Sequence, residues 1–95
     1  MNVTFDSAKD VANIAKHGDS LGFAENLDWS NALVWPDTRR DYGEARQVAL
    51  VTLKGRLYCV VFVDRGDERR IISLRKANQR EFDRYEAETE TDQAD

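Results

Sequence analysis

Three apolar segments in series, joined by short polar turns, most strongly constrain what this chain can fold into. Residues 57–63 are dense in apolar and β-branched side chains, and further apolar segments at residues 45–53 and 69–74 flank them. The intervening turns are Lys54-Gly55 and residues 64–67. Because connections this short join antiparallel strands, the sequence predicts an antiparallel meander whose central strand is residues 57–63.

The first part of the chain predicts one short strand and two helices. A strand over residues 3–6 precedes a helix over residues 7–17, which has Val11 and Ile14 on its inward face and ends at Gly18. A second short helix starts near Ser20, and residues 28–31 then turn the chain.

A polar loop is predicted between the helices and the meander. Residues 32–35 form a brief strand that Pro36, the only proline, brings to an end. Residues 37–43 are the polar loop, and loops of this kind often carry functional side chains.

The chain is predicted to close with an amphipathic helix and an acidic tail. The helix runs from Gln79 toward Thr89 and docks through Phe82 and Tyr85. Residues after Glu88 are too polar to order themselves, so we predict one domain over residues 1–88 and a disordered acidic tail over residues 89–95. The predicted fold class is α+β, with the N-terminal helices and the C-terminal helix packed on a curved antiparallel sheet.

The net charge of −4 hides a polarised distribution. Five acids and no base follow Tyr85, and without them the rest of the chain stands at about +1, with most arginines after position 38. A local basic face therefore remains compatible with nucleic-acid binding.

Several functional classes are disfavoured by composition. The longest apolar run, residues 57–63, is far shorter than a membrane span, and the N-terminus lacks an export signal, so we expect a cytoplasmic protein without membrane contact. The single Cys59 excludes a disulfide framework and a cysteine-based metal site, and we interpret it as a small core residue. We expect no metal and no cofactor.

Cations gather where the last strand meets the last helix. Arg75 and Lys76 follow the strand, while Asn78 and Glu81 have the spacing of a capping box. A helix N-terminus favours anions, and further arginines that can converge there are Arg39, Arg40 and Arg46. The junction therefore predicts a phosphate pocket.

An ordered set of motifs spans nearly the whole chain. The most specific are Lys16-His17-Gly18, the Gly-Glu-x-Arg motif ending at Arg46, and the Ile-Ile-Ser-x-Arg-Lys-Ala motif of residues 71–77. In this order the motifs resemble the BrnT toxin family of bacterial type II toxin-antitoxin systems, which are small ribonucleases with a RelE-like fold. The chain departs from the family in having Thr4 or Phe5 at the position in the first strand where a tryptophan is common, and in its more acidic tail.

The resemblance implies a growth-arresting, metal-independent endoribonuclease that cleaves mRNA. It also implies a BrnA-like antitoxin that neutralises the toxin, forms a heterotetramer with it through antitoxin dimerisation, and alone contacts the operator DNA.

Such RNA cleavage needs a base for the 2′-hydroxyl, cations for the phosphorane and an acid for the 5′-oxygen. His17, the only histidine, suits either proton-transfer role, or it only caps its helix C-terminus. Glu44 and Arg46 lie two residues apart at the predicted start of a strand, so their side chains share one face of the sheet. They are either a general base with a phosphate-binding arginine or a surface ion pair. Arg75 is the preferred group for charge stabilisation.

Other residues complete the candidate site. Tyr85 is a catalytic residue, a base-stacking residue or a packing residue of its helix. Trp29 and Trp35 are interpreted as core or partner-interface residues. The candidate RNA-binding residues are Lys16, Arg39, Arg40, Tyr42, Lys76 and Arg80.

Two alternatives stay open beside the ribonuclease. One is a catalytically inactive module that binds RNA or DNA and is retained for autoregulation. The other is an interaction protein whose sheet and acidic tail serve only to bind a partner. Cleavage of RNA would distinguish the ribonuclease from both alternatives. Binding of RNA at low salt would distinguish the inactive nucleic-acid-binding module from the interaction protein.

Overall fold

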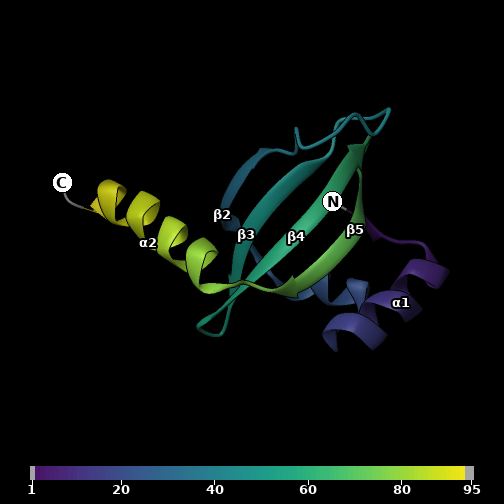
Figure 1. The fold of residues 1–95 in the computed structure, drawn as a ribbon, viewed down its shortest axis with the longest axis horizontal. Helices are drawn as coiled ribbons and strands as arrows, with labels where there is room; N and C mark the ends of the chain where they lie inside the picture. The colour runs from purple at the N-terminus through teal and green to yellow at the C-terminus, as the bar shows by residue number, and fades with distance from the viewer. Residues whose placement is uncertain (1, 94–95) are drawn as a thin grey trace.

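A computed structural model describes residues 2–93, with side chains described through residue 89. The elements along the chain are β1 (Asn2–Thr4), α1 (Ser7–His17), the 3-10 helix η1 (Leu21–Asn26), β2 (Asp28–Pro36), β3 (Gln47–Leu53), β4 (Arg56–Arg65), β5 (Glu68–Lys76) and α2 (Gln79–Gln93). They form a five-stranded sheet in the order β1-β5-β4-β3-β2 (Figure 1). The α+β class is thus as predicted.

The predicted meander is present, and β4 is its most deeply buried strand. Strands β2 to β5 pair antiparallel, and β1 pairs parallel to β5 at the sheet edge. The turn between β3 and β4 holds Lys54 and Gly55 at φ 51° and 80°, the left-handed conformation that two-residue hairpins require.

Two boundaries in the middle of the chain differ from prediction. Residues 28–31, predicted to turn the chain, are instead the start of β2. The reason is tertiary, because Trp29 packs edge-on against Phe62 on β4 and donates its indole N–H to the Ala24 carbonyl at 2.9 Å. Strand β3 begins at Gln47, so Glu44 and Arg46 lie in the loop before it and not on the strand as predicted.

Helix α1 has its predicted bounds but presents a different face to the sheet. Gly18 ends it in the left-handed conformation at φ 87°. Val11 and Ile14, predicted to point inward, are exposed, whereas Asn13 is buried. The Asn13 amide donates to the Leu74 carbonyl at 2.8 Å and accepts the Leu74 N–H at 3.2 Å, so it continues the hydrogen bonding of the β5 edge where β1 has ended.

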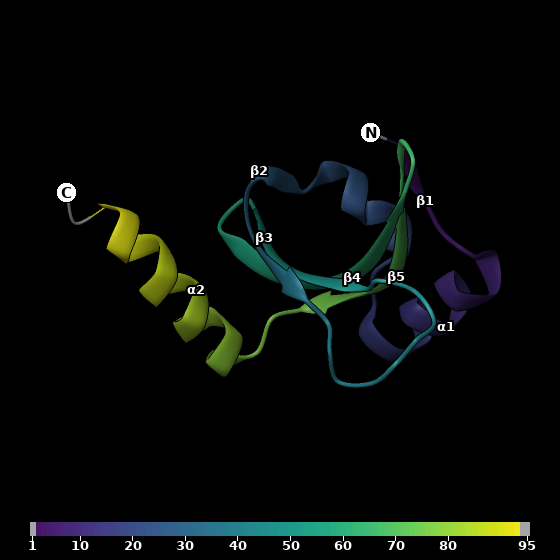
Figure 2. The same ribbon diagram turned by 90° about the horizontal axis from the view of Figure 1, so that it is seen from above.

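The two faces of the sheet are built differently. On the covered face, η1 and the start of β2 close over a cluster that includes Leu21, Phe62, Ile71 and Leu74 (Figure 2). On the opposite face, which we call the pocket face, the smaller cluster consists of Val48, Leu50, Leu57, Cys59 and Val61. The loop after β2 lies on the pocket-face side of the sheet (Figure 2).

Helix α2 starts with the predicted capping box. The Asn78 side chain accepts the Glu81 N–H, and Glu81 accepts the Asn78 N–H, each at 2.9 Å. The helix projects from the end of the sheet (Figure 1) and continues to Gln93, past the predicted end near Thr89. Residues 89–93, which were predicted to belong to a disordered acidic tail, are therefore helical, and residues 94 and 95 lie outside the described residues. No helix within residues 2–93 is long and apolar enough to span a membrane.

Candidate functional site

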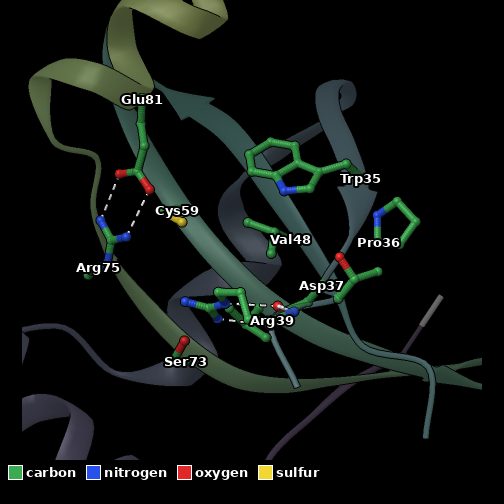
Figure 3. Close-up of a pocket in the computed structure, with 11 residues that line it drawn as sticks. Trp35, Pro36, Asp37, Arg39, Val48, Cys59, Ser73, Arg75 and Glu81 are labelled. Carbon is green, nitrogen blue, oxygen red and sulfur yellow. Dashed lines mark hydrogen bonds and ion pairs between the residues drawn. The ribbon is translucent and has the colours of Figure 1, made fainter. Parts of the chain in front are cut away.

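A pocket of about 280 Å³ opens on the pocket face, between the loop after β2, strands β3 to β5 and the start of α2 (Figure 3). Its lining residues are Trp35, Pro36, Asp37, Thr38, Arg39, Val48, Cys59, Val61, Ser73, Arg75 and Glu81. Its floor is apolar and its rim carries two arginines and two carboxylates.

The register of the strands explains this lining. Val61 on β4 lies opposite Val48 on β3 and Ser73 on β5, and Cys59 lies opposite Arg75. Neighbouring residues that are directly opposite across an antiparallel sheet project from the same face. The valine, thiol, hydroxyl and guanidinium groups therefore meet at one place.

A β-bulge decides which arginines of β5 reach this face. Phe62 pairs with Ile71 and Val61 with Ser73, so Ile72 is an extra residue between them. In a regular strand Arg69 and Arg75 would share a face, since both have odd numbers. The bulge reverses the alternation and leaves Arg69 on the covered face and Arg75 in the pocket.

Arg75 is held by a bidentate ion pair with Glu81. Its two terminal nitrogens donate to the two carboxylate oxygens at 2.8 Å each, and one of them also donates to the Lys76 carbonyl at 3.3 Å. Burial acts to raise the pKa of Glu81, but hydrogen bonds from Arg75 and the Asn78 N–H outweigh it and bring the pKa to about 2. Both groups are thus charged at neutral pH.

Arg39 is held in the same way by Asp37. Its Nε and one terminal nitrogen donate to the two oxygens of Asp37 at 2.8 Å each. The Asp37 side chain is 1% exposed and that of Arg39 is 73% exposed, so the carboxylate is a buried anchor for an accessible cation. The hydrogen bond from Arg39 lowers the pKa of Asp37 to about 2 despite burial.

The pocket is suited to binding an oxyanion. A guanidinium has five N–H donors, and the contacts above leave donors on Arg39 and Arg75 for a phosphate. Each cation is prepositioned by its carboxylate, which is the arrangement that stabilises charge developing in a reaction.

The lining residues contain no group suited to proton transfer at neutral pH. The pKa of Asp37 and of Glu81 is about 2, and burial raises the pKa of the Cys59 thiol to about 12. Cys59 is accordingly a buried free thiol in the pocket floor, in line with its interpretation as a core residue. The pocket offers positive charge and positioning, with the hydroxyl groups of Ser73 and Thr38 beside them.

The predicted anion site at the N-terminus of α2 takes a different form in the structure. The Glu81 carboxylate itself accepts the Asn78 N–H at the start of α2 and also accepts hydrogen bonds from Arg75. An external phosphate would therefore approach the arginines from the pocket and not the helix end.

The structure brings together in the pocket Arg75, a predicted catalytic residue, and Arg39, a predicted RNA-binding residue. The remaining predicted catalytic residues lie outside the pocket lining: His17, Glu44, Arg46 and Tyr85. His17 is half-buried at the end of α1. Glu44 accepts a hydrogen bond from Arg65 at 2.6 Å, and this bond is the main cause that lowers its pKa. The Tyr85 hydroxyl donates to the Asn31 carbonyl at 3.2 Å, while its ring packs against the pocket-face cluster and borders a second cavity near Phe82.

Arg46 flanks the pocket. Its carbonyl accepts the Asp37 N–H at 2.9 Å, its guanidinium lies 4.0 Å from the centre of the Tyr42 ring, and its Nε is buried without a hydrogen-bond partner. Of the remaining candidate RNA-binding residues, Lys16, Arg40, Lys76 and Arg80 are exposed. The functional roles of all these residues stay predictions.

Sequence reasoning missed the roles of Asp37, Glu81 and Trp35 in the pocket. Asp37 and Arg39 have a spacing that allows a local ion pair, and this signal was available in the sequence. Trp35 lines the pocket with Arg84 stacked at 4.0 Å from its ring centre, which the sequence did not indicate. No group of three or more His, Cys, Asp or Glu side chains in the described part of the chain is placed to hold a metal ion.

These features define a small α+β protein with an arginine-lined pocket on one face of its sheet. A profile of the family described as "Ribonuclease toxin, BrnT, of type II toxin-antitoxin system" matches residues 5–81. The fold is similar to the 1.1 Å crystal structure of the Brucella abortus ribonuclease toxin BrnT, with a TM-score of 0.67 and 30% identity over 83% of this chain and 99% of that chain. A comparison with curated proteins finds no match. The chain belongs to the BrnT family of ribonuclease toxins of type II toxin-antitoxin systems.

Proposed function

We propose that this toxin is an endoribonuclease that cleaves mRNA in the cytoplasm without a metal ion and thereby arrests growth. Membership of the BrnT family supports a ribonuclease with an RNA substrate and an antitoxin partner. The observation that carries the proposal is the pair of carboxylate-anchored guanidinium groups, Arg39 and Arg75, in one open pocket.

In the proposed reaction, the 2′-oxygen of one nucleotide attacks the adjacent phosphorus and the bond to the 5′-oxygen breaks. The products are a 2′,3′-cyclic phosphate and a 5′-hydroxyl. Arg75 donates to the non-bridging oxygens as their charge grows, and the more exposed Arg39 binds and orients the phosphate. The two arginines supply positive charge that other nucleases take from metal ions.

We also propose that the proton-transfer roles belong to His17, Glu44 or Tyr85, which would reach the RNA from outside the pocket lining. Arg46 would act as a further phosphate clamp beside Asp37. Contacts along the RNA backbone are proposed for Lys16, Arg40, Tyr42, Lys76 and Arg80.

The proposed partner is a BrnA-like antitoxin. It would neutralise the toxin in a heterotetramer formed through antitoxin dimerisation, and it would make the contacts to operator DNA. The type II description of the family supports a protein antitoxin.

Cleavage of a single-stranded RNA oligonucleotide by the purified protein tests this function. We expect 2′,3′-cyclic phosphate products in the presence of EDTA, and none when the cleaved nucleotide carries a 2′-deoxyribose. Expression without antitoxin should arrest growth and fragment cellular RNA. Arg56→Ala, which removes an exposed arginine from β4, is the matched control and should cleave like the wild type. Loss of activity on chelation, or cleavage of the 2′-deoxy substrate, would contradict the mechanism.

A second candidate is an RNA-binding module without turnover. It is favoured by one observation, the lack of a lining residue that titrates near neutral pH. Salt-dependent binding of RNA that remains intact through long incubation would support this candidate over the ribonuclease.

A further inference from the structure

We infer that Glu81 is a positioning residue for Arg75, and that through it the first turn of α2 is a working part of the pocket. This inference rests on the proposed function, because it assumes that Arg75 acts on the scissile phosphate.

The first observation is the geometry of the ion pair. Glu81 takes both terminal nitrogens of Arg75 at 2.8 Å, whereas the other bond to that guanidinium is the 3.3 Å contact with the Lys76 carbonyl. The Arg75 side chain is 36% exposed and has many rotamers, so packing alone does not hold it. A bidentate carboxylate fixes both the plane and the direction of a guanidinium.

The second observation is that the same carboxylate belongs to the helix cap. One of the two Glu81 oxygens that accept from Arg75, Oε1, also accepts the Asn78 N–H at 2.9 Å, and the Glu81 N–H donates back to the Asn78 side chain. The helix therefore holds the carboxylate, and the carboxylate holds the arginine. This geometry exists only while the first turn of α2 is formed.

The other anchored arginine lacks this dependence. Asp37 lies two residues from Arg39 and is itself buried, so the local loop is sufficient to orient that cation. The pairing of Arg75 with Glu81 instead links the end of β5 to a helix that projects from the sheet (Figure 1). Tyr85 and Arg84 attach the next turn of that helix through Asn31 and Trp35.

Glu81 does not serve as the general base in this scheme. Both oxygens already accept hydrogen bonds from positively charged or backbone donors, and its pKa of about 2 disfavours proton uptake at neutral pH. Its contribution to cleavage passes through Arg75.

The test begins with Glu81→Gln in the full chain. Glutamine retains an oxygen for the Asn78 N–H but presents an amide to Arg75, so the cap is kept and the bidentate pair is lost. We expect kcat to fall by about tenfold to a hundredfold with little change in KM, the cost of a misplaced catalytic group. Asp83→Asn removes a carboxylate from the same helical turn without touching the pocket, and it should leave kcat unchanged.

A double-mutant cycle separates positioning from a structural or independent role. If Glu81 acts through Arg75, the double variant Arg75→Ala/Glu81→Gln will cleave no more slowly than Arg75→Ala alone. A wild-type kcat in Glu81→Gln, or a further drop in the double variant as large as that of Glu81→Gln in the wild-type background, would overturn the inference. Glu81→Asp goes through the same cycle should Glu81→Gln fail to fold.

The outcomes distinguish this inference from the proposed function. A wild-type protein that does not cleave RNA refutes the ribonuclease proposal itself. A wild-type protein that cleaves, with a defective Arg75→Ala and an unaffected Glu81→Gln, refutes only the role of Glu81.

Discussion

Arg69 and Arg75 stand on the same strand and make the same kind of ion pair, yet they belong to different regions of the molecule. Arg69 donates to Asp64 at 2.7 and 2.9 Å and lies over the Trp29 and Phe62 rings on the covered face. Arg75 donates to Glu81 at 2.8 Å and borders an open pocket. The ion pair is shared, and the surroundings of the cation differ.

The comparison shows that a bidentate ion pair between an arginine and a carboxylate does not by itself identify a functional arginine. On the covered face, aromatic rings take up the guanidinium surface that the carboxylate leaves free, so Arg69 stabilises the fold. In the pocket, the remaining donors of Arg75 face space that a phosphate can enter. We therefore expect Arg69 to stabilise the fold, and we propose that Arg75 binds the phosphate of the substrate.

The largest expected effect comes from Arg75→Ala. Removing a donor that stabilises transition-state charge should lower kcat for RNA cleavage by about 10²- to 10³-fold. The midpoint of thermal unfolding should fall less than in Arg69→Ala, because the ion pair of Arg75 with Glu81 is partly exposed and the Arg75 guanidinium makes no cation–π contact among the described residues. Full toxicity of a folded Arg75→Ala variant in cells would contradict the proposed difference between Arg75 and Arg69.

Arg69→Ala should show the opposite pattern. Loss of the ion pair and of two cation–π contacts should cost about 2 kcal/mol of unfolding free energy. For a domain of this size that corresponds to a fall of roughly 10 °C in the thermal midpoint. RNA cleavage at a temperature where the variant is folded should match the wild type. A strong loss of cleavage with unchanged stability would exchange the roles of the two arginines.

Acid should act on the pocket carboxylates. The pKa of Asp37 lies at about 2 against an ordinary 3.8, and that of Glu81 at about 2 against 4.5. Because folding lowers these pKa values, their contribution to stability is complete above about pH 5 and is lost as the pH falls toward about 2. Urea unfolding across this window should show a flatter pH dependence in the Asp37→Asn/Glu81→Gln variant. An equal slope in both proteins would mean that the pocket pairs do not cause the acid sensitivity.

The smallest expected effect concerns Cys59. Burial raises the pKa of its thiol to about 12, and the residue is 4% exposed. Iodoacetamide at about pH 8 should therefore leave the folded protein unmodified and active, and should label it fully after unfolding. Mass spectrometry checks both states. Rapid labelling of the folded protein would show that the pocket floor is open.

Much of the fold could be predicted because its signals are local. The meander follows from apolar segments and short turns, and the end of α1 follows from Gly18, which takes the left-handed conformation with little strain. The capping box of α2 was predicted from Asn78 and Glu81 alone. Each depends on residues within a few positions of one another.

The errors arose where a distant contact overrides the local pattern. Strand β2 includes residues 28–31, which were predicted to form a turn, because the Trp29 ring packs against Phe62 on β4. Asn13 faces the sheet in place of Val11 and Ile14, because the unpaired edge of β5 needs a hydrogen-bonding partner. The candidate site was predicted in part for the same reason. Arg39 and Arg75 were named, but their ion pairs with Asp37 and Glu81 were not predicted.

The sequence by itself determined the order of the elements, the membership in the BrnT family and the supply of arginines. Only the tertiary structure decided which arginine enters the pocket. The extra residue Ile72 reverses the side-chain alternation of β5, so Ile71 and Leu74 can both be buried on the covered face. That burial is a property of the whole sheet, and it turns Arg75 toward the pocket while Arg69 remains on the other face.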